Sequence, residues 1–595
     1  MHVLGVSYGF HDAAAAIISD GQVVAAAQQE RFSRVKNDAG FPAEAIDFCL
    51  SSAGIAADAL SLVAYYEEPL VKFDRIVQAS INNFPASSQY LDEAVTRWIQ
   101  GGRFQVRERL AKHLSIPLDR IVTTPHHASH AASAFFPSPF DQAAVVTLDG
   151  VGEYETASIS WGSGTRLERK RSIDLPHSIG LFYSAFTAFL GFTVNEGEYK
   201  VMGMAAFGRP IWKDKLLELF TFHPDGRFSL DQDWFEFAVP EKHPYRNGLV
   251  QTFGSPRVPG APFSVSLNHM PSSVPEVAQP ELLEQSQRYA DLAASVQAVT
   301  EEVIRHVVTS AVREMGTDRV CMAGGVALNS LANGRLLRDD GLSLYVQPAA
   351  GDAGGSLGAA AYHWHHTLNG PRMSSVNTAA LGPRYGRHAV DHALARSGFD
   401  ILLATEDDDL FLNNVAELIA AGHVVGWFDG RSEWGPRSLG QRSILADPRR
   451  SDMQRIVNEK VKFREPFRPF APAIHGDRVA EFFEFPGSVD QSRPENFMLA
   501  VHPVRREWAS RLPAITHVDG TARVQIVHHR HSPRFYSLLS AVERRTGVPI
   551  LLNTSFNLNG EPIVESPADA VKTFATSGLD YLCIENRILS KALQL

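Results

Sequence analysis

Residues 3–27 read VLGVSYGFHDAAAAIISDGQVVAAA, and residues 143–161 read AAVVTLDGVGEYETASISW. Each stretch places short apolar runs on both sides of turn residues, which is typical of a β-meander. Asp20 and Gly21 form a two-residue hairpin signal between the second and third runs. Helical sequence follows both stretches, near 43–53 in the first case. The sequence therefore predicts an α/β fold in which one unit occurs twice, although the two halves share no strong sequence repeat.

The composition is that of a large globular protein. The chain has 595 residues, of which 44% are hydrophobic and 21% charged, and this excludes disordered, collagen-like and coiled-coil classes. Three cysteines cannot form a disulfide framework in a chain of this length, which favours a cytoplasmic protein. No apolar run approaches the about 20 residues that span a bilayer, and no signal peptide is recognised. With a net charge of −10, we expect neither nucleic-acid nor membrane partners.

The pattern changes several times along the chain. Residues 222–285 carry Pro, aromatic and polar residues without periodicity, which indicates a functional loop region or an insertion. Helical sequence returns at 283–315, and Gly, Pro and Ser cluster at 368–385, where we expect a domain boundary. A helix (411–421) and a strand (424–428) then open a second domain.

The motif PHHASHAASAF predicts a metal site. His126 and His130 are four residues apart, so a helix would place both imidazoles on one face. Asp149 closes a strand, and Asp352 lies in the small-residue sequence GDAGGSLG; together they give a His₂Asp₂ set that suits iron, manganese or zinc. In the alternative, His126 caps a helix and His130 is a satisfied core residue. His127 points away from that face and is expected to be structural.

Two glycine-rich sequences, GGVALN (324–329) and GDAGGSLG (351–358), are each expected to be a turn that leads into a helix. Such turns bring backbone N–H groups close to phosphate or to a nucleotide ring. Neither matches a P-loop or a dinucleotide fingerprint, so glycines that only pack helices on strands are an equal alternative.

The first turn and the segment after the hairpin carry titratable residues. His11 could act as a base there, and Lys36 could balance phosphate charge. For Arg31 and Arg34 we favour the alternative, a solvated basic edge.

A cationic segment begins at Arg431. Residues 431–468 hold ten Lys or Arg against five Asp or Glu. Converging Arg residues interleaved with glycines and aromatics are typical of a site for small phosphorylated or carboxylated anions, although some of these charges belong to a solvated face. The polar turn after the strand in 548–564 could present side chains to the same anion.

Nine motifs, taken in order, resemble one family. They are FHDA, ERFSRVK, HHASHAASAF, LDGVGE, GEYKVMGMA, GGVALN, WGPRSLGQRSILADPR, FREPFRPFAP and LLNTSFNLNGEPIV. Together they are similar to the NodU/CmcH-type O-carbamoyltransferases of nodulation factors and carbamoylated antibiotics. The resemblance runs from residue 3 to about 585, nearly the whole chain.

The resemblance implies two domains. Residues 1–370 would form an actin/hexokinase-like duplicated α/β domain that carries the metal and transfers the carbamoyl group. Residues 371–595 would form a YrdC-like α/β domain that makes carbamoyl adenylate from carbamoyl phosphate and ATP. The acceptor would be a hydroxyl of a secondary metabolite, such as an antibiotic, a sugar or a macrocycle.

The resemblance also assigns roles to individual residues. His11 matches the base of the transfer step and Lys36 a catalytic phosphate contact. The metal ligands would be His126, His130, Asp149 and Asp352. Adenylate would be bound by Gly324, Gly325 and Asn329, and the pocket for carbamoyl phosphate and ATP would be formed by Arg437, Lys462, Arg468, Arg523 and Ser555.

Residues 222–285 depart from the family pattern and are expected to be an acceptor-specific insertion. Their aromatic residues either line an apolar acceptor pocket or only pack the insertion onto the core: Trp234, Phe235, Phe237, Phe253 and Phe263.

The expected cofactors are a divalent metal, with iron first and manganese or zinc as alternatives, and Mg²⁺ with ATP. The expected partner is a small-molecule hydroxyl acceptor, and a homodimer is among the allowed oligomeric states. Two rival functions are a nucleoside or tRNA modification enzyme, which the net charge disfavours, and a non-catalytic nucleotide-binding regulator.

Overall fold

The structure is a computed structural model that describes residues 1–85, 87–237, 243–267, 270, 274–465, 467–487 and 493–591. The chain forms two compact units. The first unit comprises residues 1–9, 18–22 and 55–374, and the second comprises 10–17, 23–54 and 375–595. A single division at 370/371 does not anticipate that two N-terminal segments belong with the C-terminal unit.

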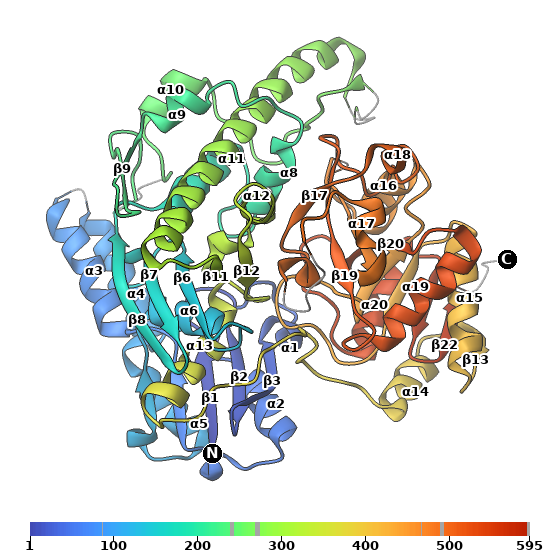
Figure 1. The fold of residues 1–595 in the computed structure, drawn as a ribbon, viewed down its shortest axis with the longest axis horizontal. Coiled ribbons are helices and arrows are strands. Elements are labelled where there is room, and N and C mark those ends of the chain that lie inside the picture. Colours follow the sequence, from blue (N-terminus) through green and yellow to red (C-terminus); the bar gives the residue numbers. More distant parts are fainter. Residues whose placement is uncertain are drawn as a thin grey trace. The chain divides into compact units, whose positions relative to one another are not determined.

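Two five-stranded sheets share one topology (Figure 1). In the first the order is β3-β2-β1-β4-β5, with bounds His2–Ser7 (β1), Ala14–Ser19 (β2), Gln22–Gln28 (β3), Leu62–Tyr65 (β4) and Ile121–Thr123 (β5). In the second the order is β8-β7-β6-β11-β12, with bounds Gln142–Leu148 (β6), Glu155–Ser163 (β7), Arg166–Asp174 (β8), Arg319–Ala323 (β11) and Ser343–Val346 (β12). Counted within each set, both orders are 3-2-1-4-5. This confirms the α/β class and the duplicated unit expected from the sequence.

The first hairpin follows the sequence signal. Asp20 has a φ of 48° and Gly21 a φ of 79°, the two positive values that a type I′ turn needs. The turn therefore sets the register between β2 and β3, and it lies at the position that the sequence predicted.

Two helices lie between the sheets of the duplicated fold. Helix α6 (His126–Phe135) follows β5 but packs on β6, β7 and β11, whereas α13 (Asp352–His366) follows β12 but packs on β1 and β4. The helices also pack against each other. A Cβ on Gly358 would lie 1.7 Å from the Ser129 carbonyl oxygen, so this approach requires glycine.

The expectation of a glycine-rich turn at 351–358 is wrong. Helix α13 begins at Asp352, so Gly354, Gly355 and Gly358 lie inside the helix. A Cβ at each of them would collide with a neighbouring segment, which is the packing role given above as the alternative.

Of the other helices of the first unit, α5, α11 and α12 pack on strands, and α7, α8 and α9 pack on α11. The bounds of the other helices of this unit are Pro69–Asn82 (α3), Ser88–Gln100 (α4), Val106–Leu114 (α5), Ile179–Phe189 (α7), Glu198–Ala205 (α8), Lys213–Leu217 (α9), Asn247–Phe253 (α10), Gln279–Met315 (α11) and Ser330–Arg338 (α12). Helix α11 packs on β6, β7 and β11 and contains the predicted helix 283–315.

The segment 222–285 packs onto this unit through aromatic side chains. Phe235 and Phe253 are buried and contact Phe186 of α7, and Phe263 is also buried. These three residues therefore fit the packing alternative, while Trp234 and Phe237 are partly exposed. Residues 238–242, 268–269 and 271–273 of the segment lie outside the described residues.

The second unit contains an eight-stranded mixed sheet of order β13-β22-β21-β14-β15-β20-β16-β19. Its strands are Asp400–Ala404 (β13), Val425–Phe428 (β14), Arg442–Ala446 (β15), Ala471–His475 (β16), Gln525–Val527 (β19), Ile550–Ser555 (β20), Tyr581–Ile584 (β21) and Arg587–Ser590 (β22). Side chains alternate between two cores: Leu551 faces one, and Ile550 and Leu552 face the other.

Helices cover both faces of this sheet. One core includes α15 (Asp408–Ala420) and α19 (Pro533–Thr546), and the other includes α14 (Arg387–Ala395), α16 (Met453–Ile456), α17 (Val479–Phe482) and α20 (Pro567–Thr576). Short helices α1 (Glu30–Ser33) and α2 (Ala43–Ala53) also belong to the second unit. The α/β class is confirmed, and the YrdC-like comparison stays a prediction. Among the described residues, no helix is both long and apolar enough to cross a bilayer.

Gly358→Ala tests the close approach of α6 and α13. Because the new methyl group would meet backbone rather than a movable side chain, we expect the opening free energy of the amides in both helices to fall by about 3 kcal/mol. Hydrogen exchange measures this locally. Gly248→Ala in α10 is the matched control, since nothing lies within 4 Å of its Cβ position. Equal protection in the two variants would contradict the packing argument.

Candidate functional site

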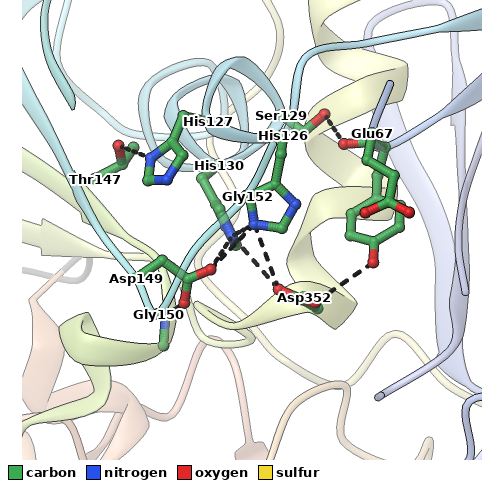
Figure 2. A network of polar contacts seen from close by, with 12 residues as sticks. Glu67, His126, His127, Ser129, His130, Thr147, Asp149, Gly150, Gly152 and Asp352 are labelled. Atoms are coloured by element: carbon green, nitrogen blue, oxygen red, sulfur yellow. Dashed lines mark hydrogen bonds and ion pairs between the residues drawn. The ribbon is translucent and has the colours of Figure 1, made fainter. Parts of the chain in front are cut away.

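Four side chains predicted as metal ligands meet in the first unit (Figure 2). His126 and His130 stand one turn apart at the start of α6, and Asp352 is the first residue of α13. Asp149 directly follows β6. One donor atom from each residue lies within 4.8 Å of all the others. The site thus forms where the N-termini of the two central helices meet the end of a strand.

The distances between the donor atoms match the coordination shell of a small metal ion. The Nε2 atoms of His126 and His130 are 3.0 Å apart, and Asp149 Oδ2 lies 3.0 and 3.5 Å from them. Asp352 Oδ1 lies 3.7 and 3.6 Å from the same nitrogens. Ligands at about 2.1 Å from a metal are separated by about 3.0 Å in an octahedron and about 3.4 Å in a tetrahedron. The arrangement can therefore hold a divalent ion with little movement.

The electrostatics of the cluster favour a cation. Burial by itself lowers the pKa of His130, but hydrogen bonds to Asp149 and Asp352 outweigh it and raise the pKa to about 9. Burial would raise the pKa of Asp149, yet contacts with His126 and His130 hold it well below its usual range. The two carboxylates therefore stabilise a positive charge within the cluster, whether a proton or a metal ion carries it.

Residues around the cluster orient its ligands. The Gly325 N–H donates to Asp149 Oδ1 at 2.9 Å, and the Tyr66 hydroxyl donates to Asp352 Oδ2 at 3.4 Å. Glu153 accepts the His126 backbone N–H, which anchors the first turn of α6. These contacts leave each carboxylate one oxygen directed at the imidazoles.

His127 has the structural role expected of it. Its Nδ1 lies 2.7 Å from Thr147 Oγ1 and its Nε2 lies 2.9 Å from the Glu155 carbonyl oxygen, so both ring nitrogens are engaged away from the cluster (Figure 2).

The GGVALN sequence does form a turn, and it supports the metal cluster. Gly324 has a φ of 95°, and a Cβ there would lie 2.1 Å from the Leu148 carbonyl oxygen. Asn329 caps α12 by accepting the Ala332 N–H, and it exchanges hydrogen bonds with Gln297. The adenylate contacts expected of Gly324, Gly325 and Asn329 stay a prediction.

A cluster of cations lies in the second unit. Burial lowers the pKa of Arg523 well below its usual value, and Arg437, Arg464 and Arg468 lower it further. Burial likewise lowers the pKa of Lys462, with Arg464, Arg468 and Lys36 adding to the effect. The predicted pocket residues are therefore within electrostatic reach of one another, and a bound anion would relieve their repulsion.

Lys462 also links two segments of the cation cluster through hydrogen bonds. Its ammonium donates to Ser555 O at 2.6 Å and Oγ at 3.1 Å, and to Asn557 Oδ1 at 2.6 Å and O at 3.0 Å. Four acceptors thus share three N–H groups. Lys462 joins its own loop to the turn after β20 and fixes Ser555 beside the cations.

The loop that carries Arg437 is held by a buried carboxylate. Glu433 Oε1 accepts the backbone N–H groups of Leu439, Gln441 and Arg442 at 2.7, 2.8 and 3.3 Å. Three such bonds in a buried environment give Arg437 a rigid support.

The structure groups His11 and Lys36 with the second unit. His11 Nδ1 lies 3.0 Å from Asp12 Oδ2, which fixes the orientation of the ring. Lys36 is close enough to Lys462 to affect its pKa. The structure thus brings Lys36 to the cation cluster, and its role in the reaction stays a prediction.

The solvated basic edge favoured for Arg31 and Arg34 is wrong. Arg31 is 3% exposed and donates to the Gly435 carbonyl oxygen at 2.8 Å. Arg34 donates to the carbonyl oxygens of Ile563 and Pro562 at 2.7 and 3.0 Å. Both residues bind backbone far along the chain, where guanidinium groups supply several directed donors.

Four residues of the two clusters and their supports have no signal in the sequence: Arg464, Asn458, Glu433 and Glu153. Arg464 and Glu433 stood in the Arg-rich segment, but nothing in their spacing separates a pocket residue from a solvated one. Glu153 was part of the turn GVGE and gave no sign that it anchors a helix.

Two family models match this chain: Carbamoyltransferase N-terminus over residues 2–361 and Carbamoyltransferase C-terminus over residues 416–591. The chain belongs to the carbamoyltransferase family. The metal cluster lies inside the first match, and most of the cation cluster lies inside the second. Carbamoyl transfer is therefore the general activity of this protein.

Relatives of this carbamoyltransferase cover most of its length. An uncharacterized protein of Synechocystis sp. is 41% identical over 100% of this chain and 97% of that protein. Nodulation protein NolNO of Sinorhizobium fredii is 36% identical over 98% of this chain and 79% of that protein. Nodulation protein NolO of Bradyrhizobium diazoefficiens is 37% identical over 77% of each.

Similarity to solved structures is weak. Component A of the Acidaminococcus fermentans (R)-2-hydroxyglutaryl-CoA dehydratase is 16% identical with a TM-score of 0.31, covering 61% of this chain and 97% of that one. HypF of T. kodakarensis is 15% identical with a TM-score of 0.31, covering 62% and 48%. The fold of this carbamoyltransferase is therefore defined by its strand order and not by these similarities.

Metal uptake should depend on pH in a defined direction. A metal needs the neutral imidazole of His130, so below its pKa of about 9 each metal bound displaces one proton. We expect the affinity of the metal-free protein for Zn²⁺ to rise about tenfold per pH unit from 6.5 to 8.5. Competition with a chelating dye, corrected for the dye's own titration, measures it.

His366→Ala is the matched control, because this exposed histidine lies on the same helix as Asp352. It should leave the slope unchanged, whereas His130→Ala should abolish tight binding. Tight uptake by His130→Ala would contradict the ligand set.

Proposed function

We propose that this carbamoyltransferase makes carbamoyl adenylate from carbamoyl phosphate and ATP in its second unit. The carbamoyl group then passes to a hydroxyl of a small secondary metabolite. The cation cluster around Arg523 carries the proposal, because Lys462 and four guanidinium groups held close together need an anion of several charges. Both co-substrates are such anions.

The first reaction would consume one water. Carbamoyl phosphate loses its phosphate to water, and an oxygen of the resulting carbamate attacks the α-phosphorus of ATP, so that pyrophosphate leaves. Arg437, Arg468 and Arg523 would hold the phosphate groups. Ser555 would donate a hydrogen bond to them by turning its hydroxyl away from Asn557 Oδ1, to which it donates at 2.7 Å. Making and using the adenylate within one protein would limit its loss to water.

The second reaction would form a carbamate ester. The acceptor oxygen bonds to the carbamoyl carbon while the bond from that carbon to the phosphate oxygen breaks, and AMP leaves. His11 would take the hydroxyl proton, since its contact with Asp12 sets the tautomer in which Nε2 is basic. Lys36 would balance the charge that develops on the phosphate.

His126, His130, Asp149 and Asp352 would hold a divalent metal. When bound, it would supply a Lewis acid that fixes phosphate oxygens of the nucleotide. Two imidazoles and two carboxylates suit iron, manganese or zinc; we propose iron, with Mg²⁺ accompanying ATP. The net charge of −10 supports a small acceptor rather than RNA.

Pyrophosphate release tests the first reaction. With metal-loaded protein, ATP and no acceptor, we expect release only when carbamoyl phosphate is added. Release of labelled pyrophosphate from γ-³²P-ATP measures it separately from the unlabelled phosphate that carbamoyl phosphate yields. Absence of release from folded, metal-loaded protein, with or without an acceptor mixture, would overturn the proposal and favour a nucleotide-binding regulator.

Two variants test the division of labour. Arg437→Ala should lower carbamoyl-phosphate-dependent pyrophosphate release at least 100-fold and still consume carbamoyl adenylate supplied ready-made. His130→Ala should show the reverse, because its metal site serves transfer. Quenched-flow detection of AMP and pyrophosphate separates the two steps. Equal loss of both steps in both variants would contradict two separate centres.

A further inference from the structure

A π-helical turn, η7 (Val457–Val461), directly precedes Lys462. Such turns are rare and recur at functional sites. The turn is held from outside by the Gly578 N–H, which donates to the Lys460 carbonyl oxygen at 3.0 Å. A Cβ on Gly578 would lie 2.5 Å from that same oxygen, so any larger residue at position 578 would collide with the turn.

Asn458 within this turn binds two arginines of the cation cluster. Its side chain is fully buried. Oδ1 accepts the Nε–H of Arg464 at 2.7 Å, and Nδ2 donates to the Arg468 carbonyl oxygen at 3.0 Å. The Arg464 N–H also donates to the Asn458 carbonyl oxygen at 3.1 Å. One side-chain amide thus binds both Arg464 and Arg468.

Arg464 belongs to the cation cluster. It lowers the pKa of Lys462 and of Arg523, so its charge lies near both. Its guanidinium carbon lies 4.8 Å from the centre of the Phe470 ring, which supports one face of the group. With Nε held by Asn458 and one face on Phe470, the direction of the guanidinium is set before any ligand arrives.

We propose that Arg464 is a further phosphate-binding residue of the second unit and that Asn458 is the positioning residue that aims it. The inference rests on the proposed function, because the phosphate would belong to carbamoyl phosphate or to ATP. A neutral amide suits the task, since a carboxylate at this depth would neutralise the cation that it holds. Asn458 can instead accept from Arg464 and donate to the loop at the same time.

The test compares Arg464→Gln, Asn458→Ala and the double variant in the pyrophosphate-release assay. We expect Arg464→Gln to raise the KM of one co-substrate about 10- to 100-fold, as for the loss of a charge-assisted hydrogen bond. A rise for carbamoyl phosphate alone assigns the phosphate to that substrate, and a rise for ATP alone assigns it to the nucleotide. Arg464→Lys should recover part of the loss.

Asn458→Ala should raise the same KM about fivefold in the wild-type background and less than twofold in Arg464→Gln. A residue that only stabilised the fold would give the same factor in both backgrounds. Asn458→Gln, which keeps both polar groups but displaces them, serves where the alanine variant does not fold. Arg455→Gln is the matched control, an exposed cation of the same segment paired with Glu459, and should change neither KM.

Failure of this inference and failure of the proposed function give different results. Wild-type turnover with both KM values unchanged in Arg464→Gln would overturn the inference alone. If the wild type releases no pyrophosphate, calorimetry with inorganic phosphate decides: a tenfold weaker binding in Arg464→Gln supports the inference, and equal binding overturns it. A wild type that binds no phosphate would overturn the anion site and the inference together.

Discussion

The backbone contact between Gly358 and Ser129 is the constraint on which the first unit depends. It lets α6 and α13 meet between the two sheets, and their N-termini carry His126, His130 and Asp352. Helix N-termini bear partial positive charge, so both carboxylates of the cluster lie where the backbone favours them. Because each central helix packs on the sheet that did not precede it, neither half of the duplicated fold can form the cluster alone.

The second unit contains a cluster of positively charged side chains, whereas the cluster in the first unit contains two carboxylates. The cations repel one another, and two of them are held by neutral acceptors: Lys462 by Ser555 and Asn557, and Arg464 by Asn458. Arg468 instead lies 3.5 Å from the carboxylate of Glu465. Carboxylate partners close to every cation would stabilise the unit but would also compete with a ligand. The two units therefore contain clusters of opposite character, one of imidazoles and carboxylates and one of cations.

The features that the sequence predicted correctly are those that depend only on residues close together in the chain. Three features are of this kind. They are the turn at Asp20 and Gly21, the position of His126 and His130 on one face of a helix, and the strand that ends before Asp149. The packing role of Gly355 and Gly358 in α13 has no local signal, because the residues that they contact, Tyr66 and Ser129, are distant in sequence. Arg31 was misread for the same reason, since its partner is the carbonyl oxygen of Gly435.

The contact between Asn458 and Arg464 could not be predicted from the sequence because it depends on an unusual helical turn. A π-turn shifts every following side chain by one position, so a helical wheel places Lys462 and its neighbours on the wrong face. The excess of Lys and Arg in residues 431–468 identifies the cationic segment. The course of the backbone decides which of its arginines lie close together and which face solvent.

The discontinuous path of the second unit constrains how the protein is made. Arg34 leaves the ribosome early, yet its partners Pro562 and Ile563 are synthesised more than 500 residues later. At about 5–20 residues per second, that wait lasts on the order of half a minute to two minutes. Contacts of such sequence separation also slow folding. The segment 23–54 must therefore stay available while the first unit is completed, and residues 375–595 expressed alone would lack a structural part of their own unit.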